Sequence, residues 1–310
     1  MSDILLEVKN LVKNYGNYRA VDGISFQVER GKAVGFLGPN GAGKTTTIQI
    51  LCGITLPNGG TISYFGKDFA KHKEFCLQKI NFGSAFNTLL GRITAYENLL
   101  VYANLYGIKN AKKKIDELLE YFEITHIARE LYQNLSAGQK TRVNLVKSLL
   151  NDPEILLMDE PTASLDPDIA DKTLSLIEEL RKTRNLSLLF TSHNMEEVTR
   201  ICDEVIFLDK GKIVAQDTPL GLTKRIQRAH LRLMFDDGEK KVAEYLQKNN
   251  YSFSFEEKHT VGIETIEKNI PKIIFGLSQE GIWITDIEVK KPNLEDVFLQ
   301  IARGEAYETT

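Results

Sequence analysis

Residues 38–46 read Gly38-Pro39-Asn40-Gly41-Ala42-Gly43-Lys44-Thr45-Thr46. A glycine, four further residues and then Gly-Lys-Thr form the P-loop pattern, whose glycines let the backbone curl so that successive N–H groups face one anion. The apolar run over 32–37 predicts a buried strand before the loop, and residues 47–51 predict a helix after it. Because a helix N-terminus adds positive potential, strand, loop and helix together predict a phosphate-binding site.

Two polar side chains of this loop have chemistry that suits a nucleotide. Lys44 is expected to reach the β- and γ-phosphates, and the hydroxyl of Thr45 is expected to ligate Mg²⁺. The alternative is a glycine-rich turn that happens to carry a Lys-Thr pair. The flanking strand and helix favour nucleotide binding, although the loop by itself predicts only that phosphate is bound.

The composition is that of an ordinary globular protein. The chain has 310 residues, of which 42% are hydrophobic and 26% are charged, and this length suggests two domains or one large domain with an appendage. A net charge of −3 gives no basic face for a nucleic acid, so no nucleic-acid partner is expected. Cys52, Cys76 and Cys202 lie far apart, with neither metal spacing nor a disulfide framework.

The hydropathy pattern predicts a cytoplasmic chain. No apolar run approaches the roughly 18 residues of a membrane span, and the N-terminus opens without the basic region of a signal peptide. Any link to a membrane is therefore expected to come through a partner.

The N-terminal part predicts a small antiparallel sheet. Residues 4–11 have strand character, and residues 25–29 alternate with period two before a turn. Tyr15 lies between these segments, where its ring could either fill the edge of the sheet or stack on a purine. The position of Tyr15 in the sequence does not decide between filling the sheet edge and stacking on a purine.

A mostly helical block, about residues 85–151, interrupts the alternation of strands and helices. Thr94 and Glu97 form a capping-box pattern before one helix, and residues 112–122 have the amphipathic pattern of a second. Ser136 is a natural N-cap for a third helix. The block is predicted to be an inserted helical subdomain.

Acidic residues end the next predicted strand. The apolar run over 154–158 is typical of a central parallel strand, and it leads directly into Asp159-Glu160. Carboxylates at the carboxyl edge of a parallel sheet lie where phosphates bind in such folds, and this pair fits a metal-associated Asp beside a base. His193 follows the next predicted strand, 186–190. A lone His is more often structural, but this position predicts that it shares the same sheet edge.

The character of the chain changes after Thr218-Pro219. Residues 230–289 show a strand–helix–strand–strand–helix–strand order, which is the split-βαβ or ferredoxin-like pattern. A last helix is predicted from Asn293. This part contains no catalytic constellation and is expected to be an accessory domain.

The set of motifs and its order resemble the ATP-binding subunits of ABC transporters. The resemblance covers residues 4–218, and it rests on a Walker A motif at 38–45, a signature at 135–139, a Walker B motif at 155–159 with Glu160, a D-loop at 164–166 and a switch histidine, His193. The C-terminal part, with Leu294-Glu295-Asp296-Val297-Phe298-Leu299, looks like the extension of exporter-type ATPases whose permease is a separate chain.

This resemblance implies the fold. It is an α/β P-loop NTPase (ABC ATPase) core over residues 1–220, with an antiparallel β subdomain and a helical subdomain at about 85–151. A small α+β, ferredoxin-like accessory domain over residues 221–310 follows the core.

The resemblance also implies ATP and Mg²⁺ as cofactors and assigns a role to each site residue. Tyr15 would stack on adenine, which settles its open role. Thr45 would bind Mg²⁺ directly and Asp159 would support it, while Glu160 would act as general base and His193 would contact the γ-phosphate. The residues that would cradle the triphosphate are Gly38, Pro39, Asn40, Gly41, Ala42, Gly43, Lys44, Thr45 and Thr46.

Partners follow from the same resemblance. Ser136 and Gly138 would close on the ATP of a second subunit, so that a head-to-tail dimer, expected to be a homodimer, would complete two sites. A separate multi-span permease would hold the chain at the cytoplasmic face of a membrane, docking near Phe86, Leu89, Leu90 and Tyr96. Export would follow from ATP-driven closure of the dimer. The alternatives are a soluble ABC ATPase that remodels a ribosome, nucleic-acid or protein complex, and a weakened ATPase that acts as a nucleotide-gated switch.

Two positions depart from the family pattern. The signature reads Ser136-Ala137-Gly138 where the family usually has Ser-Gly-Gly. At the Q-loop, Ala85 stands about where a glutamine is expected, and Asn87 is a shorter substitute. Metal coordination and coupling to the permease are the parts of the resemblance that these two departures affect.

Overall fold

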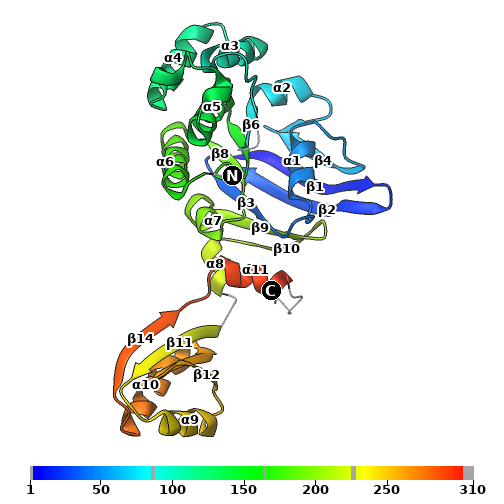
Figure 1. The fold of residues 1–310 in the computed structure, drawn as a ribbon. Coiled ribbons are helices and arrows are strands. Elements are labelled where there is room, and N and C mark those ends of the chain that lie inside the picture. Colours follow the sequence, from blue (N-terminus) through cyan, green and yellow to red (C-terminus); the bar gives the residue numbers. More distant parts are fainter. Residues whose placement is uncertain (1–2, 85–87, 164, 225–227, 303–310) are drawn as a thin grey trace. The chain divides into compact units, whose positions relative to one another are not determined.

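The computed structural model describes residues 3–84, 88–163, 165–224 and 228–302 (Figure 1). It divides the chain into two compact units, Met1–Pro219 and Leu220–Thr310. No helix within the described ranges combines the length and the apolar character that a membrane crossing needs.

A six-stranded sheet forms the centre of the first unit, with the strand order β10-β9-β3-β8-β7-β6. Neighbouring strands from β6 to β9 are parallel, and β10 is antiparallel at one edge. β3, β7 and β8 are almost wholly buried because their apolar runs are covered on both faces, as is usual for parallel strands. The strands are β3 (Ala33–Leu37), β6 (Ile80–Ser84), β7 (Ile155–Asp159), β8 (Ser187–Thr191), β9 (Glu204–Asp209) and β10 (Lys212–Asp217).

A second, antiparallel sheet of the first unit has the order β2-β1-β4-β5. Its apolar side chains share a core with the central sheet, where the rings of Phe26 and Phe36 meet edge to face with centroids 5.0 Å apart. This core places the β1–β2 hairpin beside the strand that leads into the P-loop. The strands are β1 (Ile4–Tyr15), β2 (Tyr18–Glu29), β4 (Gly59–Tyr64) and β5 (Lys67–Asp68).

The helical block contains three α-helices that lie together on one side of the first unit (Figure 1). Thr94 forms the predicted capping box with Glu97, and Ser136 forms a second one with Gln139. The block comprises α3 (Ala95–Leu105), α4 (Ala111–Tyr121), α5 (Ala137–Leu149) and 3₁₀ turns at Thr125–Ile127 and Tyr132–Asn134. The other helices of this unit are α1 (Lys44–Leu51), α2 (Lys73–Gln78), α6 (Pro167–Arg184) and α7 (Met195–Ile201).

The second unit contains one four-stranded antiparallel sheet with the order β12-β13-β11-β14. One face of this sheet packs its apolar side chains against α9 and α10, in a core that includes Leu231, Val242, Ile263 and Ile273. The elements follow the predicted strand–helix order, while assignment to the ferredoxin-like class stays a prediction. They are α8 (Pro219–Lys224), β11 (Arg228–Phe235), α9 (Glu239–Lys248), β12 (Ser252–Glu257), β13 (Thr260–Ile266), a 3₁₀ turn (Glu267–Asn269), α10 (Ile270–Gln279), β14 (Ile284–Lys290) and α11 (Leu294–Ala302).

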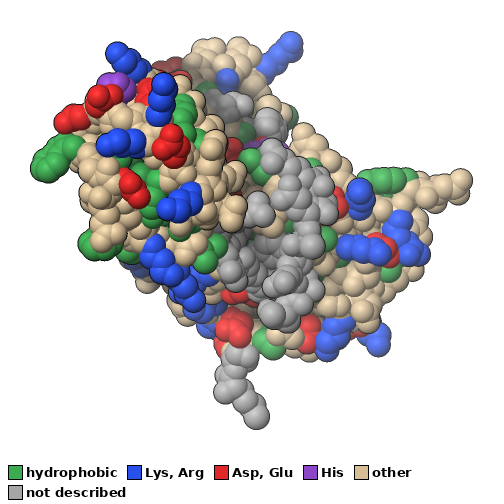
Figure 2. Space-filling view, turned by 90° about the horizontal axis from the view of Figure 1, so that it is seen from below, with side chains coloured by type: hydrophobic (Ala, Val, Ile, Leu, Met, Phe, Trp, Pro, Cys, Tyr) green, Lys and Arg blue, Asp and Glu red, His purple; other side chains and the backbone are tan. Residues whose placement is uncertain are grey.

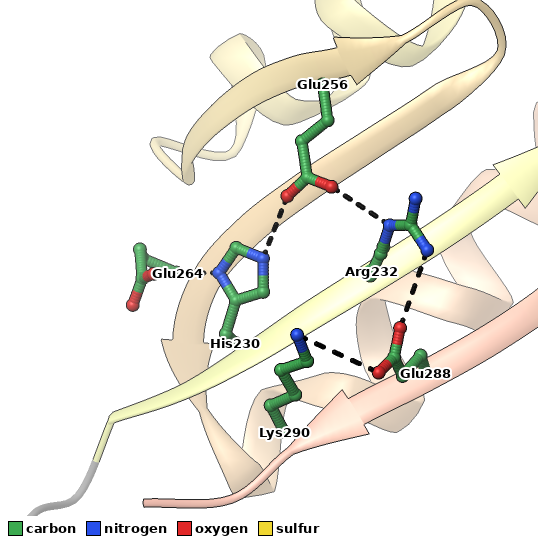
Figure 3. A network of polar contacts seen from close by, with 6 residues as sticks. All are labelled: His230, Arg232, Glu256, Glu264, Glu288 and Lys290. Atoms are coloured by element: carbon green, nitrogen blue, oxygen red, sulfur yellow. Dashed lines mark hydrogen bonds and ion pairs between the residues drawn. The ribbon is translucent and has the colours of Figure 1, made fainter. Parts of the chain in front are cut away.

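The other face of this sheet carries a network of charged side chains (Figure 3). Glu256 of β12 reaches across β13 to His230 at 3.1 Å and Arg232 at 2.9 Å on β11. It crosses at Gly262, where a Cβ atom would come within 2.5 Å of the Glu256 carboxylate. The network also includes Glu264, at 2.8 Å from His230, together with Glu288 and Lys290.

Figure 2 shows one face of the molecule with Lys and Arg side chains interspersed among Asp and Glu side chains. The hydrophobic side chains on this face form small separate patches. The mixture of signs on the described side chains agrees with the small net charge of −3.

Candidate nucleotide-binding and hydrolysis site

The P-loop adopts a backbone conformation that its glycines make possible. Gly38 and Gly43 have φ angles of 143° and 104°, in the region that L-residues rarely adopt. They are also sites of close approach, because a Cβ atom would come within 2.1 Å of the Leu208 carbonyl oxygen at Gly38 and within 2.5 Å of the Ala20 carbonyl oxygen at Gly43. The loop therefore folds against β9 and β2, and α1 begins at its end.

Lys44 lies buried at the start of α1. Its ammonium donates to the carbonyl oxygens of Gly38, at 2.5 Å, and Pro39, at 3.2 Å. Burial lowers the pKa of Lys44, and the carboxylates of Glu160 and Asp159 oppose that lowering. The lysine thus lies between the loop and the two acids of the next motif. The neighbouring Thr45 is exposed at the start of the same helix.

Asp159 and Glu160 lie at the carboxyl end of β7, and β8 aligns Thr191 with Asp159. Thr191 is fully buried. Its hydroxyl donates to Asp159 Oδ1 at 2.6 Å and accepts from the Glu160 N–H at 3.1 Å. Glu160 has a φ of 49°, a left-handed conformation that is uncommon for a non-glycine residue and that turns the chain away from the strand.

His193 contacts Glu160 directly. Its Nε2 lies 2.7 Å from Glu160 Oε1, and the histidine side chain is half-exposed. The prediction that both residues share one sheet edge is confirmed, because β7 and β8 are parallel neighbours and each residue closely follows its strand. The carboxylate of Glu160 and the imidazole of His193 therefore lie in direct contact at the edge where β7 and β8 end.

A buried carboxylate supports the loop that carries His193. Glu197 of α7 accepts from the hydroxyl of Ser192 at 2.6 Å and from that of Thr162 at 2.7 Å. It thereby joins the segments that follow β7 and β8. The sequence patterns did not reveal Glu197 or Thr191. Thr191 bonds to Asp159, 32 residues away, and Glu197 bonds to Thr162, 35 residues away. The nearer partner of Glu197, Ser192, carries a hydroxyl of a kind that is common in loops.

Tyr15 lies at the tip of the β1–β2 hairpin, opposite Tyr18. Its ring is 48% exposed, and the ammonium of Lys13 lies 5.1 Å from the ring centroid. The ring is not part of the sheet core, so its exposure does not favour the alternative role of filling the sheet edge. Tyr18 reaches the P-loop itself, where its hydroxyl donates to the carbonyl oxygen of Gly41 at 3.0 Å.

The signature residues form the N-terminus of α5. Ser136 and Gln139 cap one another, and both Ser136 and Ala137 are exposed. At Gly138 a Cβ atom would come within 2.8 Å of Ile169 on α6, so this glycine permits a close approach of the two helices. Among the described residues, the side-chain hydroxyl of Ser136 accepts from the Gln139 N–H within the capping box, and the Ser136 carbonyl oxygen accepts from the Lys140 N–H at 2.9 Å in the same helix. Within the part of this chain that the structure describes, no hydrogen bond of Ser136 or Gln139 reaches Lys44, Glu160 or His193.

The departures at the Q-loop lie outside the described residues, since Ala85, Phe86 and Asn87 are not among them. The strand before them is described, and it ends at Ser84 beside Asp159. Ala137, the departure in the signature, is exposed.

Lys147 links α5 to the strand before the Q-loop. Its buried ammonium donates to Asn81 Oδ1 and to the Phe82 carbonyl oxygen, each at 3.2 Å. Burial lowers the pKa of Lys147 to about 8. Lys147 matches no motif in the sequence, and its one local signal is its place four residues after Val143, on the apolar face of the helix.

The donor groups present suit a nucleotide-bound Mg²⁺ rather than a protein-bound metal centre. Within the part of the chain that the structure describes, no cluster of three or more His, Cys, Asp or Glu residues could hold a metal ion. Mg²⁺ in phosphate-transferring proteins typically takes one or two protein oxygens and completes its coordination with phosphate and water. The hydroxyl of Thr45 and the carboxylate of Asp159 are donors of that kind.

A P-loop at the end of a central parallel strand, with an acid pair and a histidine at the same sheet edge, defines a P-loop NTPase. A family model described as "ABC transporter" matches residues 21–163. The bacitracin transport ATP-binding protein BcrA of Bacillus licheniformis is 33% identical over 303 residues, which cover 97% of this chain and 98% of that protein. The chain therefore belongs to the ATP-binding subunits of ABC transporters, and it binds and hydrolyses ATP.

Two other relatives are also named as ATP-binding proteins. The linearmycin resistance ATP-binding protein LnrL of Bacillus subtilis is 32% identical over 96% of this chain and 98% of its own length. The Nod factor export ATP-binding protein I of Ralstonia nicotianae is 37% identical over 69% of this chain and 67% of its own length. The matches to BcrA and LnrL include the second unit, because they cover 97% and 96% of this chain.

Solved structures agree with this family. CbiO1 from Clostridium perfringens, part of the ABC transporter complex cbiONQ, superposes with a TM-score of 0.65 at 26% identity and covers 79% of this chain and 95% of its own. The ADP conformation of MJ1267, an ATP-binding cassette of an ABC transporter, gives a TM-score of 0.62 at 26% identity over 69% of this chain and 91% of its own.

Proposed function

We propose that this chain uses ATP hydrolysis at the Lys44–Glu160–His193 cluster to drive a separate membrane permease, as one half of a dimer. The contact of 2.7 Å between Glu160 and His193, at the same sheet edge as the P-loop, carries this proposal. It supplies a base and a histidine where the terminal phosphate of ATP would lie. The relatives named for transport, resistance and export support the coupling to a permease.

Glu160 is the proposed general base. Water attacks the γ-phosphorus, its proton passes to the Glu160 carboxylate, and the bond between the γ-phosphorus and the bridging oxygen breaks to give ADP and phosphate. His193 orients Glu160 through the ring nitrogen that faces it and contacts the γ-phosphate. Thr191 and Glu197 hold the two loops that carry these residues.

The P-loop binds the triphosphate. Its backbone N–H groups and the ammonium of Lys44 face the β- and γ-phosphates, and Tyr15 stacks on adenine. Mg²⁺ bound with ATP supplies positive charge at the β- and γ-phosphates. Thr45 and Asp159 are the residues that hold it. The remaining residues of this proposed cradle are Gly38, Pro39, Asn40, Gly41, Ala42, Gly43 and Thr46.

A second subunit completes the site. Ser136 and Gly138 lie at an exposed helix N-terminus, whose N–H groups and dipole suit the γ-phosphate held by a partner. We propose a head-to-tail homodimer with two ATP molecules between its faces. The permease docks on the helical block near Leu90, which is 63% exposed, and so holds the dimer on the cytoplasmic face of the membrane.

The Glu160→Gln variant tests the catalytic part of this proposal. The amide cannot take the proton of the attacking water, so ATP turnover should fall by at least a hundredfold while ATP still binds. An ATP-dependent dimer should then accumulate, and light scattering during gel filtration would detect it. Glu196→Gln, an exposed neighbour of the supporting Glu197, is the matched control. Turnover that survives in Glu160→Gln would contradict the assigned base.

Recovery of the partner tests the coupling. Tagged chain purified from solubilised membranes should bring down a multi-span protein, and replacement of the exposed Leu90 by Asp should reduce that recovery. A chain that carries no membrane protein under these conditions would instead favour a soluble ATPase.

A further inference from the structure

Tyr18 is a side chain at the tip of the β1–β2 hairpin that contacts the P-loop. Its hydroxyl donates to the carbonyl oxygen of Gly41 at 3.0 Å, across 23 residues of sequence. The ring is 57% exposed, so this tyrosine contributes little to a core. The P-loop pattern does not include it, and the nucleotide roles described above do not use it.

The inner end of the hairpin is attached to the loop through the backbone. The Ala20 carbonyl oxygen lies so close to Gly43 that a Cβ atom there would come within 2.5 Å of it. The N–H of Asp22 donates to the Gly211 carbonyl oxygen at 2.8 Å, and the N–H of Gly211 donates to the Ala42 carbonyl oxygen at 3.1 Å. Strand β2 therefore lies alongside the P-loop in space. Tyr18 adds a side-chain contact to the loop nearer the tip of the hairpin.

Tyr15 and Tyr18 are directly opposite one another in the β1–β2 register. Opposite residues of an antiparallel pair project from the same face, and only a short turn with Gly16 at a φ of 58° separates this pair. A displacement of Tyr18 therefore displaces Tyr15. The hydroxyl contact to Gly41 therefore connects the hairpin tip that carries Tyr15 to the P-loop.

We propose that Tyr18 is a positioning residue that holds the adenine-stacking ring of Tyr15 in register with the phosphates of ATP. The inference rests on the adenine role proposed above for Tyr15. Tyr18 touches neither the reacting atoms nor the base. It acts on affinity for an adenine nucleotide, and one neutral hydrogen bond corresponds to a change of about threefold to tenfold.

The Tyr18→Phe variant of the full chain tests this inference, because it removes one hydroxyl and keeps the ring. Dissociation constants would be measured by calorimetry for ATP and for inorganic tripolyphosphate, which lacks adenine. ATP should bind about threefold to tenfold more weakly, and tripolyphosphate should bind within about twofold of the unchanged chain. Equal weakening of both probes would show that the hydroxyl only shapes the loop. Unchanged ATP binding would show that it does nothing, and either result overturns the proposal.

A double-mutant cycle with Tyr15→Ala separates this inference from the proposed function. In the Tyr15→Ala background, Tyr18→Phe should add no further loss of ATP affinity, and a full additional loss would overturn the proposal. ATP binding that is normal in Tyr15→Ala alone would remove the adenine role of Tyr15 instead. Tyr245→Phe is the matched control, because its hydroxyl also donates to a backbone carbonyl oxygen, that of Lys272, but in the second unit. Both probes should bind this control as they bind the unchanged chain.

Discussion

The hydroxyl of Thr191 joins the side chain of Asp159 to the backbone of Glu160. It donates to Asp159 Oδ1 at 2.6 Å and accepts from the Glu160 N–H at 3.1 Å. Glu160 has a left-handed φ of 49°, which few non-glycine residues keep without support. Thr191 is thus the residue that sets where both carboxylates of the site lie.

Replacement of Thr191 by Val should lower both stability and turnover. Valine fills the same volume but leaves the Asp159 carboxylate without this donor, while the Glu160 N–H keeps its bond to the Thr191 carbonyl oxygen at 3.0 Å. The free energy of unfolding should fall by about 1–3 kcal/mol. Displacement of the base should reduce ATP turnover by about tenfold or more. Urea unfolding and ATP hydrolysis measure the two effects. Thr173→Val is the control, because its buried hydroxyl donates to the Ile169 carbonyl oxygen within α6, and it should lose stability without this loss of turnover.

The residues that sequence reasoning found and those it missed differ in a physical way. Glu160 and His193 closely follow strand ends and Lys44 begins the helix after the P-loop, so local pattern and strand order were enough to place them. Thr191 and Tyr18 act through contacts that span 32 and 23 residues. Such contacts depend on how strands align, which a single sequence does not state.

At the scale of elements, buried strands and capped helices were predictable and the outer half of the β1–β2 hairpin was not. β7 and α5 have local signals, namely an apolar run and a Ser-Gln capping box. β1 and β2 each have 12 residues, longer than the predicted 4–11 and 25–29. Register shifts at Val8/Leu11 and Lys13/Asn14 break the period-two alternation, so the outer half of the hairpin showed no strand pattern.

Lys147 connects two of these elements, α5 and β6, through a buried charge. Burial lowers its pKa to about 8 from an ordinary value of 10.5. At a pH between these two values, the unfolded chain keeps a proton that the folded chain has released. Stability therefore rises with pH across this window, and below pH 8 the cost of burying the charge is fully present.

The Lys147→Met variant should lose this pH dependence. Between pH 8 and 10, the free energy of unfolding of the unchanged chain should rise relative to that of the variant, by up to about 1.4 kcal/mol per pH unit. Urea midpoints of both proteins at pH 7, 8.5 and 10 measure the difference. Lys140→Met, on the same helix, should keep the slope of the unchanged chain. A parallel pH profile for Lys147→Met would show that this ammonium does not titrate in the folded state.

At the scale of the whole molecule, the two units differ in what their charged groups do. The acids and the histidine of the first unit lie at a sheet edge beside the P-loop. In the second unit, the charged groups neutralise one another across the outer face of its sheet (Figure 3). His230 faces Glu256 of β12 and Glu264 of β13, Arg232 lies beside it on β11, and Glu288 and Lys290 extend the network on β14.

This network makes the stability of the second unit depend on pH in a defined direction. Its contact with Glu264, and then that with Glu256, raises the pKa of His230 above 6.5, because both ring nitrogens face carboxylates and only the imidazolium can donate to both. The stabilisation is therefore fully present below pH 6.5 and is lost as the pH rises through the folded pKa. The pKa of Glu256 is lowered, chiefly by His230, so its contribution is lost only in acid.

Hydrogen exchange on the full chain would show this effect unit by unit. Between pH 6 and pH 8.5, protection factors corrected for intrinsic exchange should fall for β11, β12 and β13, because neutral His230 can donate to only one of Glu256 and Glu264 and so loses one of its two contacts. In His230→Gln the same strands should show little change over this range, since the amide carries no titrating proton. His259→Gln is the matched control, because His259 stacks on Phe235 in the same unit, and it should keep the fall. If the protection factors of these strands fell by the same amount in His230→Gln, other groups would be responsible for the pH dependence, and titration of His230 would not affect the stability of the second unit.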